Sequence, residues 1–512
     1  MAELSPGDGV PAGERPFPPG DYPLIVVGSG PGGIQLSYCL SRVGVPHAVI
    51  SADPGPGGMF RRWPFFQRLL SWTKPYAPVE RGTPAFERYD WNSLLADEPE
   101  HRAIMPTYMD ATSEFPSRAE MEMNIATFVE RTGVRVRYDC RWTATRRDGD
   151  RFVLETTDGE YRAPTIVMAI GIAEPWLPPT PGLEGCDHYG DTRAPETYAG
   201  RRVFIIGKQV SGFELASGLL QWACQIVLAS PSPAKLSVNT KSLVGIRARY
   251  LQPYEDHVLG GGVTILDGSI DRVDRTAEGA FLVRLRRTDD AADMAIEVDD
   301  IIAATGFQTP LLDLPELGVA TFGQSRIPAQ TPFWESASVP RVYFAGTITQ
   351  GSTGLRKHGL PANSGAVHGA RYNARVLSRH IAGKQFGWTA ERPSIAPRDL
   401  TDFILDVCST SPELYHQRAY LAHTISVDPS QGIRDEGIVP LAAWLDSPAD
   451  DGLAVTIEAD GSGAIYPVVY LRRAGSTEEV ALDPHPLLDF RTEDHRRRID
   501  EVAARVAGSS VG

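Results

Sequence analysis

Cysteine is scarce in this chain of 512 residues, and long apolar runs are absent. The five cysteines form no C-x-x-C pair; they are Cys39, Cys140, Cys186, Cys224 and Cys408. This spacing argues against a dithiol redox centre and a structural zinc site, and it favours a reducing compartment. Because no apolar run approaches the roughly 20 residues of a membrane helix, we expect a cytoplasmic protein that makes no contact with a membrane.

Positive charge is also in short supply. The 50 lysines and arginines are outnumbered by 64 aspartates and glutamates, and the net charge of −14 disfavours a nucleic-acid partner. Residues 1–20 are rich in proline, glycine and acid and lack the regions of a signal peptide, so we expect a disordered lead. The rest of the chain has an ordinary globular composition and enough length for about three domains.

Residues 24–53 have the pattern of a βαβ unit. An apolar strand at 24–27 runs into a glycine-rich turn, apolar residues at helical spacing follow, and a second apolar strand covers 48–50. In the dinucleotide fingerprint the glycines permit a tight turn, close approach of a pyrophosphate, and close packing of helix on strand. The pyrophosphate would lie at the helix N-terminus, where free N–H groups favour an anion. The turn consists of Gly28, Ser29, Gly30, Pro31, Gly32 and Gly33.

The second strand of this unit does not end in the expected acidic residue. A carboxylate at that position would bind the ribose hydroxyls of the dinucleotide. Ser51 occupies the position, and Asp53 is the nearest carboxylate. Either the Ser51 hydroxyl binds the ribose or Asp53 reaches back to it, and we favour shared binding.

The following segment combines glycines with a cluster of aromatic residues. Paired glycines at 57–58 suit either a loop that passes close to a cofactor or a plain surface turn. Residues 61–75 are dense in aromatic side chains, with Gln67 and Lys74 among them. We expect this cluster either to belong to the core or to line a planar ring. The candidate cofactor-contacting residues of the segment are Gly58, Met59 and Trp63.

Three later strands end in a small residue followed by glycine, an arrangement that suits chain crossovers beside a bound dinucleotide. The strands are expected at 165–170, 301–304 and 342–344, and the residues at their ends are Ala169, Gly171, Thr305, Gly306, Gly346 and Thr347. Ser117 and Glu120 form a capping box that predicts the start of a helix. Residues 134–138 are typical of a strand, and 362–381 of a helix.

A second strand–turn–helix–strand unit begins at residue 202. Its turn contains Gly207, Lys208, Gln209, Ser211 and Gly212, so that Gln209 replaces the middle glycine. The next strand ends at Ser230, with no carboxylate to favour NAD and no immediate arginine to favour NADP. This unit either binds NAD(P)H or is a degenerate fold kept for structure. Candidate contacts for a 2′-phosphate are Lys208, Lys235, Lys241, Arg247 and Arg249.

The chain changes character near residue 391. A helix is expected over 400–422, followed by alternating strands at 454–457 and 465–471. No ligand spacing or nucleophile motif is found in this extension. We expect a small α+β unit that either covers a site or makes a homo-oligomer contact.

The sequence resembles the flavoproteins with two dinucleotide-binding domains, and among them the flavin-containing monooxygenases, including the plant auxin-forming and bacterial N-hydroxylating types. Residues 22–385 carry the likeness. Its motifs are the two glycine turns, Gly57-Gly58-Met59-Phe60, Phe115-Pro116-Ser117-Arg118, Ala304-Thr305-Gly306-Phe307 and Phe344-Ala345-Gly346. The implied fold is α/β with two Rossmann-like domains and a C-terminal α+β extension. The implied boundaries are an FAD-binding domain at 21–194 and 331–390, an NAD(P)H-binding domain at 195–330 and the extension at 391–512.

By resemblance, the first unit binds FAD and the second binds NAD(P)H, with NADPH favoured. The protein would be a monooxygenase that uses O₂ to oxygenate a small-molecule substrate at a nitrogen, sulfur or carbonyl centre through a C4a-(hydro)peroxyflavin. The helix after the third crossover strand would aim its N-terminus at the pyrimidine edge of the flavin. Gln67 and Lys74 resemble the near-flavin glutamine and lysine of the N-hydroxylases. His358 is a third catalytic candidate, and both it and His368 are either structural or catalytic.

Several positions depart from the family pattern. The FxGxxxH hallmark is absent, because Gly182 and Glu184 stand where it requires phenylalanine and glycine before His188. Thr347 replaces the aspartate of the disulfide reductases, which together with the missing C-x-x-C argues against that branch. The alternative hypothesis is an FAD-dependent oxidoreductase with another electron donor or acceptor and a degenerate nicotinamide site. A non-enzymatic flavin-bound partner or sensor protein is the second alternative.

Overall fold

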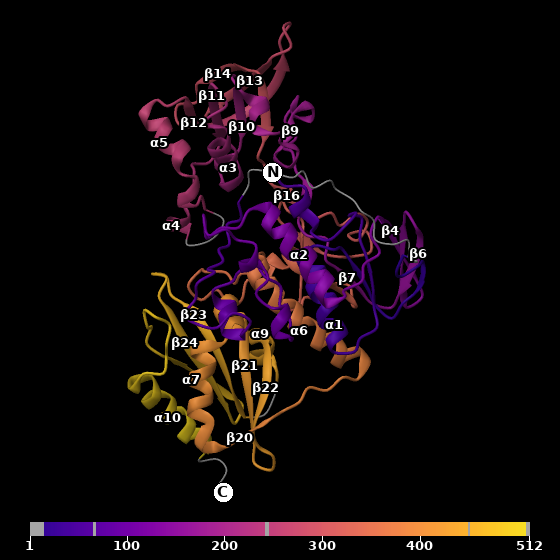
Figure 1. Ribbon diagram of the computed structural model, residues 1–512, viewed down its shortest axis with the longest axis vertical. Helices are drawn as coiled ribbons and strands as arrows, with labels where there is room; N and C mark the ends of the chain where they lie inside the picture. Colours follow the sequence, from indigo (N-terminus) through magenta and orange to yellow (C-terminus); the bar gives the residue numbers. More distant parts are fainter. Residues whose placement is uncertain (1–14, 65–67, 241–244, 449–450, 508–512) are drawn as a thin grey trace.

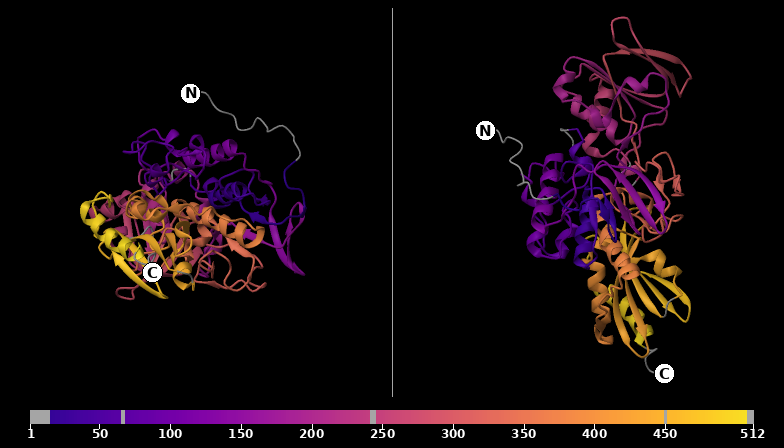
Figure 2. Two further views of the ribbon diagram at one scale, coloured as in Figure 1. Left: turned by 90° about the horizontal axis from the view of Figure 1, so that it is seen from below. Right: turned by 90° about the vertical axis from the view of Figure 1, so that its right-hand side faces the viewer.

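The computed structural model describes residues 15–64, 68–240, 245–448 and 451–507. Three bodies follow one another along the long axis of the molecule (Figure 1). The domain predicted to bind NAD(P)H lies at one end, the domain predicted to bind FAD lies in the middle, and the C-terminal extension lies at the other end. The side view in Figure 2 shows the same order. The predicted α/β fold with two Rossmann-like units is confirmed.

The middle domain is built on a parallel sheet of four short, fully buried strands. The strand order is β19-β7-β2-β3, formed by Val342–Phe344, Ile166–Met168, Ile25–Val27 and Ala48–Ile50. Helix α1 (Pro31–Arg42) follows β2 directly and packs against α6 (Val367–Phe386). Because the strands are apolar on both faces, each face must be covered, which is the condition of a doubly wound sheet.

A second sheet and one helix complete this domain. The sheet has the order β1-β6-β5-β4, formed by Gly20–Asp21, Gly159–Ala163, Arg151–Thr156 and Trp142–Asp148. Residues 15–20, the described end of the predicted lead, reach this sheet, where Arg15 pairs with Asp158 at 3.1 Å. Helix α2 (Arg118–Thr132) begins with the predicted capping box of Ser117 and Glu120, which is confirmed.

The predicted strand at 134–138 is wrong. Only Arg137 pairs there, in an isolated parallel bridge with Ile50. The pairing ends because the chain turns at Asp139, whose φ of 54° does not fit an extended strand.

The other Rossmann unit has a sheet of seven strands in the order β14-β13-β12-β11-β10-β15-β9. The strands are Asp293–Val298, Phe281–Arg287, Val263–Arg275, Gln225–Ser230, Arg202–Ile206, Asp300–Ala303 and Asp187–His188. Its helices are α3 (Val210–Leu219), α4 (Ser237–Thr240) and α5 (Gln252–Leu259). The strands β8 (Glu174–Pro175) and β16 (Phe307–Gln308) pair where the chain crosses between the two domains. A further small hairpin consists of β17 (Thr321–Phe322) and β18 (Ile327–Pro328).

The extension is an antiparallel sheet with helices beside it. Its strand order is β20-β22-β21-β23-β24-β25, formed by Ser394–Ile395, Gly432–Pro440, Leu421–Asp428, Gly452–Ala459, Ile465–Arg473 and Ser476–Ala481. The helices are α7 (Leu400–Thr410), α8 (Pro412–His416), α9 (Leu441–Asp446) and α10 (Glu493–Ala507). The predicted single helix over 400–422 is wrong, because Ser411 is extended before Pro412 and the chain enters β21 at Leu421.

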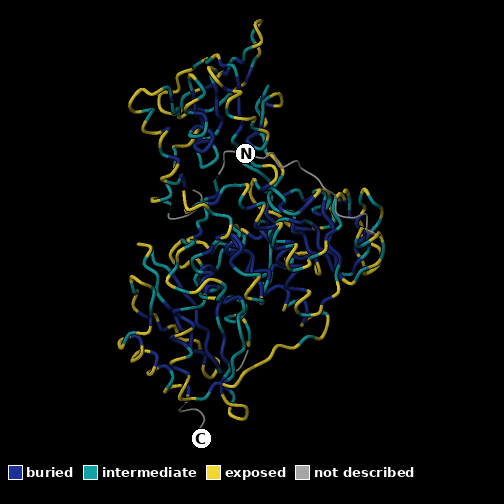
Figure 3. Tube along the Cα trace, in the orientation of Figure 1, coloured by how far each residue is buried: buried dark blue, intermediate teal, exposed yellow. Residues whose placement is uncertain are grey.

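The extension shares one hydrophobic core with the middle domain. Leu36 of α1, Leu377 of α6, and Leu421 and Leu453 of the extension belong to a single cluster of buried side chains. Figure 3 shows buried segments in both the middle domain and the extension, while the chain that links them at 389–394 is exposed. The extension is therefore packed as part of the middle domain. Within the described residues no helix is both long and apolar enough to cross a membrane.

Candidate functional site

The first glycine turn is shaped by three glycines with different surroundings. A Cβ atom on Gly28 would lie 2.4 Å from the carbonyl oxygen of Ala169, and one on Gly33 would lie 2.0 Å from that of Gly28. These two positions therefore exclude any larger residue. A Cβ on Gly30 would meet no atom within 4 Å. Gly30 thus faces open space, as a position that a cofactor approaches should.

The N-terminus of α1 offers free N–H groups to that space. Gly30 is the N-cap, no side chain caps the helix, and Pro31 occupies its first turn. Two other glycine segments close on the same place, because a Cβ on Gly32 would lie 2.3 Å from the Cα of Gly346 and one on Gly58 would lie 3.0 Å from that of Gly30. The uncapped helix end and the backbone-lined space fit the pyrophosphate of a dinucleotide.

The end of β3 carries the polar groups predicted to bind a ribose. The hydroxyls of Ser29 and Ser51 lie 2.8 Å apart and are buried. The backbone N–H of Asp53 donates to the Ser51 hydroxyl at 3.2 Å, and the Asp53 carboxylate pairs with Arg62 at 3.4 Å. Ser51 and Asp53 are thus in contact, which is compatible with shared binding.

Tyr138 is a candidate that sequence reasoning missed. Its hydroxyl is buried and has no hydrogen-bond partner among the described residues. Burial and the nearby Asp53 carboxylate raise the pKa of Tyr138 to about 12, so the phenol stays neutral and can donate. No spacing rule points to it, because it reaches Asp53 only through the isolated bridge between Arg137 and Ile50.

The segment after Gly58 places aromatic rings near the first turn. Trp63 packs edge-on against Phe60, with ring centroids 4.6 Å apart. Met59 and Phe60 both belong to the 3₁₀ helix Gly58–Arg61. At the far end of the site, a Cβ on Gly171 would lie 3.3 Å from the Thr347 hydroxyl, so the ends of β7 and β19 meet.

Two of the three predicted catalytic residues, Lys74 and His358, lie in the described part of the chain, and each has a different neighbour there. Gln67 lies outside the described residues, as do Phe65 and Phe66. Lys74 is exposed, with its amino group 5.1 Å from the centre of the Trp72 ring. His358 is also exposed and lies 3.0 Å from the Tyr466 hydroxyl of the extension.

The second glycine turn repeats the geometry of the first. A Cβ on Gly207 would lie 2.4 Å from the Ala304 carbonyl oxygen, and one on Gly212 would lie 2.1 Å from that of Gly207. Gln209 is the N-cap of α3, ahead of Ser211, and its amide oxygen is buried without a partner among the described residues. At the crossover from β15, the Thr305 hydroxyl donates to the Trp176 carbonyl, and the Gly306 carbonyl lies 3.0 Å from His188 Nε2.

The candidate 2′-phosphate contacts have different surroundings. The amino group of Lys208 is buried in an ion pair with Asp267, while Lys235 is exposed. Arg247 and Arg249 both lie over the Phe115 ring of the middle domain, at 5.9 and 5.8 Å. Lys241 lies outside the described residues. The Ser230 hydroxyl donates to the Ser232 carbonyl at 3.2 Å.

Four of the five cysteines have surroundings that do not activate the thiol. All five are free, and Cys39, Cys140 and Cys408 are buried. Burial raises the pKa of each of these three thiols, and it raises that of Cys186 to about 11. A high pKa leaves little thiolate at neutral pH, so none of these four is poised as a nucleophile.

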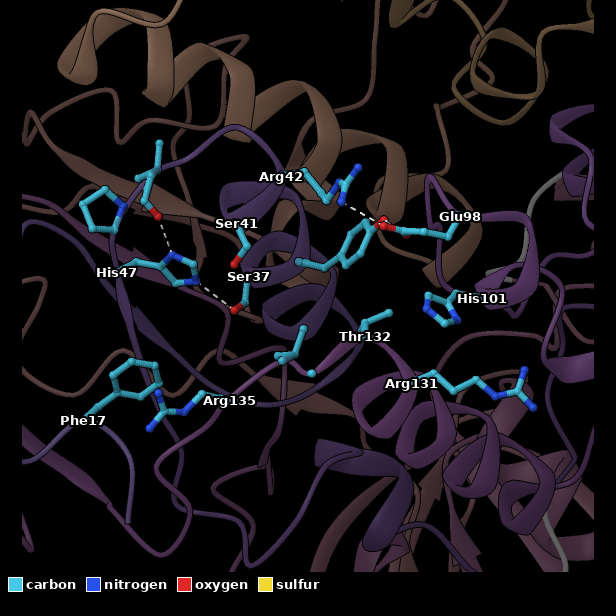
Figure 4. Close-up of a pocket in the computed structure, with 15 residues that line it drawn as sticks. Phe17, Ser37, Ser41, Arg42, His47, Glu98, His101, Arg131, Thr132 and Arg135 are labelled. Atoms are coloured by element: carbon cyan, nitrogen blue, oxygen red, sulfur yellow. Dashed lines mark hydrogen bonds and ion pairs between the residues drawn. The ribbon is translucent and has the colours of Figure 1, made fainter. Parts of the chain in front are cut away.

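A cavity of about 430 Å³ lies at the other end of α1, between that helix and the end of α2. Figure 4 shows His47 bonded to Ser37, at 2.8 Å, and Arg42 paired with Glu98, also at 2.8 Å. Each of these four side chains thus has another of them as its polar partner. The cavity is separated from the glycine turn by the length of the helix.

Two glycine turns at the ends of parallel strands, each opening on an uncapped helix, define a flavoprotein with two dinucleotide-binding domains. Residues 25–346 match the family model described as pyridine nucleotide-disulphide oxidoreductase, and the chain belongs to this family.

The chain is similar to the FAD-dependent oxidoreductase domain-containing protein 2 of Mus musculus, with 27% identity over 443 residues. The alignment covers 79% of this chain. It spans 64% of the length of that relative. Two similar solved structures share the fold. A bacillithiol disulfide reductase from Bacillus cereus has a TM-score of 0.54 at 20% identity, covering 72% of this chain and 100% of that one. A flavin-containing monooxygenase from Stenotrophomonas maltophilia has a TM-score of 0.52 at 20% identity, covering 71% and 99%.

Proposed function

We propose that this protein is an FAD-dependent monooxygenase that uses NAD(P)H and O₂ to oxygenate a small molecule at a nitrogen, sulfur or carbonyl centre. The observation that carries the proposal is the pair of equivalent glycine turns in one chain, together with free cysteines at positions that form no dithiol motif. A reductase of disulfides would need such a thiol pair, whereas oxygen transfer needs none.

The residues of the first turn fit FAD. Gly30 and the free N–H groups of α1 would hold the pyrophosphate, and Ser51, Asp53 and Tyr138 would bind the ribose at the end of β3. FAD, when bound, supplies hydride acceptance and reaction with O₂. The protein would orient the substrate and exclude water, and the aromatic rings of Phe60 and Trp63 suit both tasks.

The second turn would hold the nicotinamide cofactor, and we expect NADPH to be preferred over NADH. The strand β11 ends at Ser230, whose neighbour in the sheet is Asp267. The charge of Asp267 is offset by the ammonium group of Lys208. Among the described residues, no unpaired carboxylate is therefore left at this strand end to bind the 2′-hydroxyl of NADH or to repel the 2′-phosphate of NADPH.

Gln209 favours the second candidate function, an FAD-dependent oxidoreductase with a different electron donor or acceptor. Its side chain occupies the place of the glycine that a pyrophosphate approaches, and its amide oxygen has no partner among the described residues. An amide oxygen repels a phosphate, while the amide N–H₂ would attract one.

Stopped-flow spectroscopy separates the two candidates. The FAD-loaded protein is mixed anaerobically with NADPH or NADH, and the loss of the visible absorbance of oxidised flavin is followed. The reduced protein is then mixed with O₂ in the presence of amine, thioether and ketone panels. Bleaching followed by incorporation of labelled oxygen into a product supports the proposal. Absence of bleaching with both nucleotides contradicts it and favours the second candidate.

A further inference from the structure

The extension reaches the N-terminus of α6, the helix end that the family resemblance aims at the flavin. Gln417, just after α8, donates to the Ser364 hydroxyl at 3.0 Å. Asn363 donates to the carbonyl oxygen of His416 at 2.8 Å. The segment 412–420 therefore lies directly against the residues that precede α6.

Two buried imidazoles meet at this junction. His368 in the first turn of α6 and His416 at the end of α8 have no exposed surface, and their ring centroids are 5.3 Å apart. Both ring nitrogens of His368 and Nδ1 of His416 lack a hydrogen-bond partner among the described residues. Burial keeps the pKa of each imidazole well below its usual value, so both are neutral and each carries one N–H donor. Unpaired buried groups of this kind are costly unless something completes them.

The charges that act on His368 are both positive. They belong to Arg371 and Arg418, which lower the pKa of the His368 ring further. Arg371 is already occupied, because its guanidinium donates to the carbonyl oxygens of Ser93 and Asp90 at 2.5 and 2.8 Å.

The carboxylates of the neighbourhood have other partners. Glu413 pairs with Arg375 at 3.2 Å, and Glu87 accepts from the Tyr372 hydroxyl at 2.9 Å. Asp90 accepts from the Thr73 hydroxyl at 2.9 Å through one oxygen, while its other oxygen has no partner among the described residues.

Arg418 has no counter-ion among the described residues. Its Nε donates to the Tyr415 carbonyl at 3.0 Å, and its guanidinium lies 5.1 Å from the centre of the Tyr415 ring. Within the described residues its two terminal nitrogens make no hydrogen bond or ion pair. Arg88 lies over the same ring at 5.0 Å but donates to the Ser409 carbonyl. Both arginines thus lie over the Tyr415 ring. A terminal nitrogen of Arg88 donates a hydrogen bond within the described residues, whereas those of Arg418 do not.

We propose that Arg418 and His368 bind the carboxylate of a small organic acid at the junction of the extension with the FAD-binding domain. The inference rests on the proposed function and deepens it, since the substrate would then carry an anionic group. A guanidinium binds a carboxylate through two parallel hydrogen bonds, and the His368 N–H would supply a third donor. The first turn of α6 has no side-chain cap, so its free N–H groups add to the positive potential. The Trp91 ring packs between His368, at 4.3 Å, and Trp72, at 4.5 Å, so the surroundings of His368 are aromatic and suit a ligand with a flat apolar part.

Benzoate is a suitable probe because it joins a carboxylate to a flat apolar ring. Its affinity for the FAD-loaded protein is measured by calorimetry, with benzamide as the uncharged counterpart. We expect benzoate to bind and benzamide not to bind. R418Q should weaken benzoate binding about 10-fold or more, as expected for loss of a charged hydrogen bond. R418K, which keeps the charge, should retain part of the affinity, and the matched control R88Q should leave it unchanged.

Three results would overturn the site. One is absence of benzoate binding by the unmodified protein at concentrations on the order of 10 mM. Another is equal binding by R418Q and the unmodified protein. The third is an R418Q variant that binds benzoate normally but whose bound FAD has a more negative reduction potential, which would assign the arginine to the flavin itself. R418K keeps the test usable if R418Q does not fold.

The same variants separate this inference from the proposed function. Reduction of their bound FAD by NADPH is followed without any organic acid. If NADPH reduces the bound FAD neither in the unmodified protein nor in any variant, the proposed function fails. The benzoate titration then still decides whether the anion site exists. If reduction is normal and the titration fails, only the anion site is lost.

Discussion

The ammonium group of Lys208 has no exposed surface and is paired with Asp267, which is 44% exposed. The pair joins the second glycine turn to strand β12, next to the end of β11. Lys208 was one of five candidates for a 2′-phosphate contact, and its amino group is here engaged by Asp267.

We predict that K208M changes the nucleotide preference. Methionine fills a similar volume and leaves the Asp267 carboxylate unpaired beside Ser230, where it can bind the 2′-hydroxyl of NADH and repel the 2′-phosphate of NADPH. The ratio of kcat/KM for NADPH over NADH should fall by about 10-fold, equivalent to about 1.4 kcal/mol. Steady-state kinetics with both nucleotides checks this, and D267N in the same background should restore the original ratio. An unchanged ratio in K208M would show that Asp267 does not face the nucleotide.

G30A and G28A form a matched pair for the first turn. An alanine Cβ at position 30 meets open space, so the apo protein should melt within a few degrees of the unmodified protein while FAD affinity falls at least about 10-fold. At position 28 the Cβ would collide with the Ala169 carbonyl, and φ there is 113°, so the fold itself should be destabilised by several kcal/mol (about 3). Fluorescence titration with FAD and thermal melts of both apo proteins measure the two effects. Normal FAD binding by G30A would exclude the turn as the pyrophosphate site.

Stability should fall in mild acid because of His380 on α6. Burial lowers the pKa of His380 to about 4, while an unfolded histidine has its ordinary pKa near 6.5. As pH falls, the unfolded state therefore takes up the proton before the folded state does. His380 does not change the free energy of unfolding above about pH 6.5, lowers it progressively below that pH, and has its full effect below about pH 4. The cost is about 2 kcal/mol after allowance for partial exposure.

H380F should remove the share of this pH dependence that comes from His380, while the buried His368 and His416 keep theirs. The ring of His380 stacks on Phe333 with centroids 4.1 Å apart, and phenylalanine can keep that contact without a titrating group. Urea unfolding of both proteins between pH 4 and 7 makes the comparison. Parallel stability curves over this range would mean that His380 takes up its proton in the folded state.

The ion pair of Lys357 with Glu458 should matter more than a surface pair. Glu458 is 2% exposed and lies 2.9 Å from the amino group of Lys357. K357M leaves this carboxylate buried without its cation and should cost about 3 kcal/mol, while the double variant K357M/E458Q should recover part of the loss. Denaturant unfolding of the single and double variants gives the coupling energy. A cost for K357M below about 1 kcal/mol would place the pair in the class of solvent-screened pairs.

Local sequence patterns predicted the parts of the fold that depend on neighbours in the chain. The glycine spacing from Gly28 to Gly33 and the capping box at Ser117 each act within a few residues, and the structure has both units. The predicted helix over 400–422 failed because apolar spacing alone did not register the break at Pro412.

The rest of the site depends on contacts between distant segments. Lys208 meets a carboxylate 59 positions later, Tyr138 reaches Asp53 across an isolated bridge, and Arg418 approaches His368 only because the extension folds back on α6. No spacing within one segment encodes such encounters. The contact of Ser51 with Asp53 joins residues two positions apart at a strand end, so it was predictable. The ion pair of Lys208 with Asp267 was not.

The single core that joins α1 and α6 to the sheet of the extension limits how this protein can be divided. A chain cut near residue 390 would leave the apolar side of α6 facing water, and we expect such a fragment to aggregate rather than bind a cofactor. Domain exchange between relatives would for the same reason have to carry the last 120 or so residues along with the nucleotide fold.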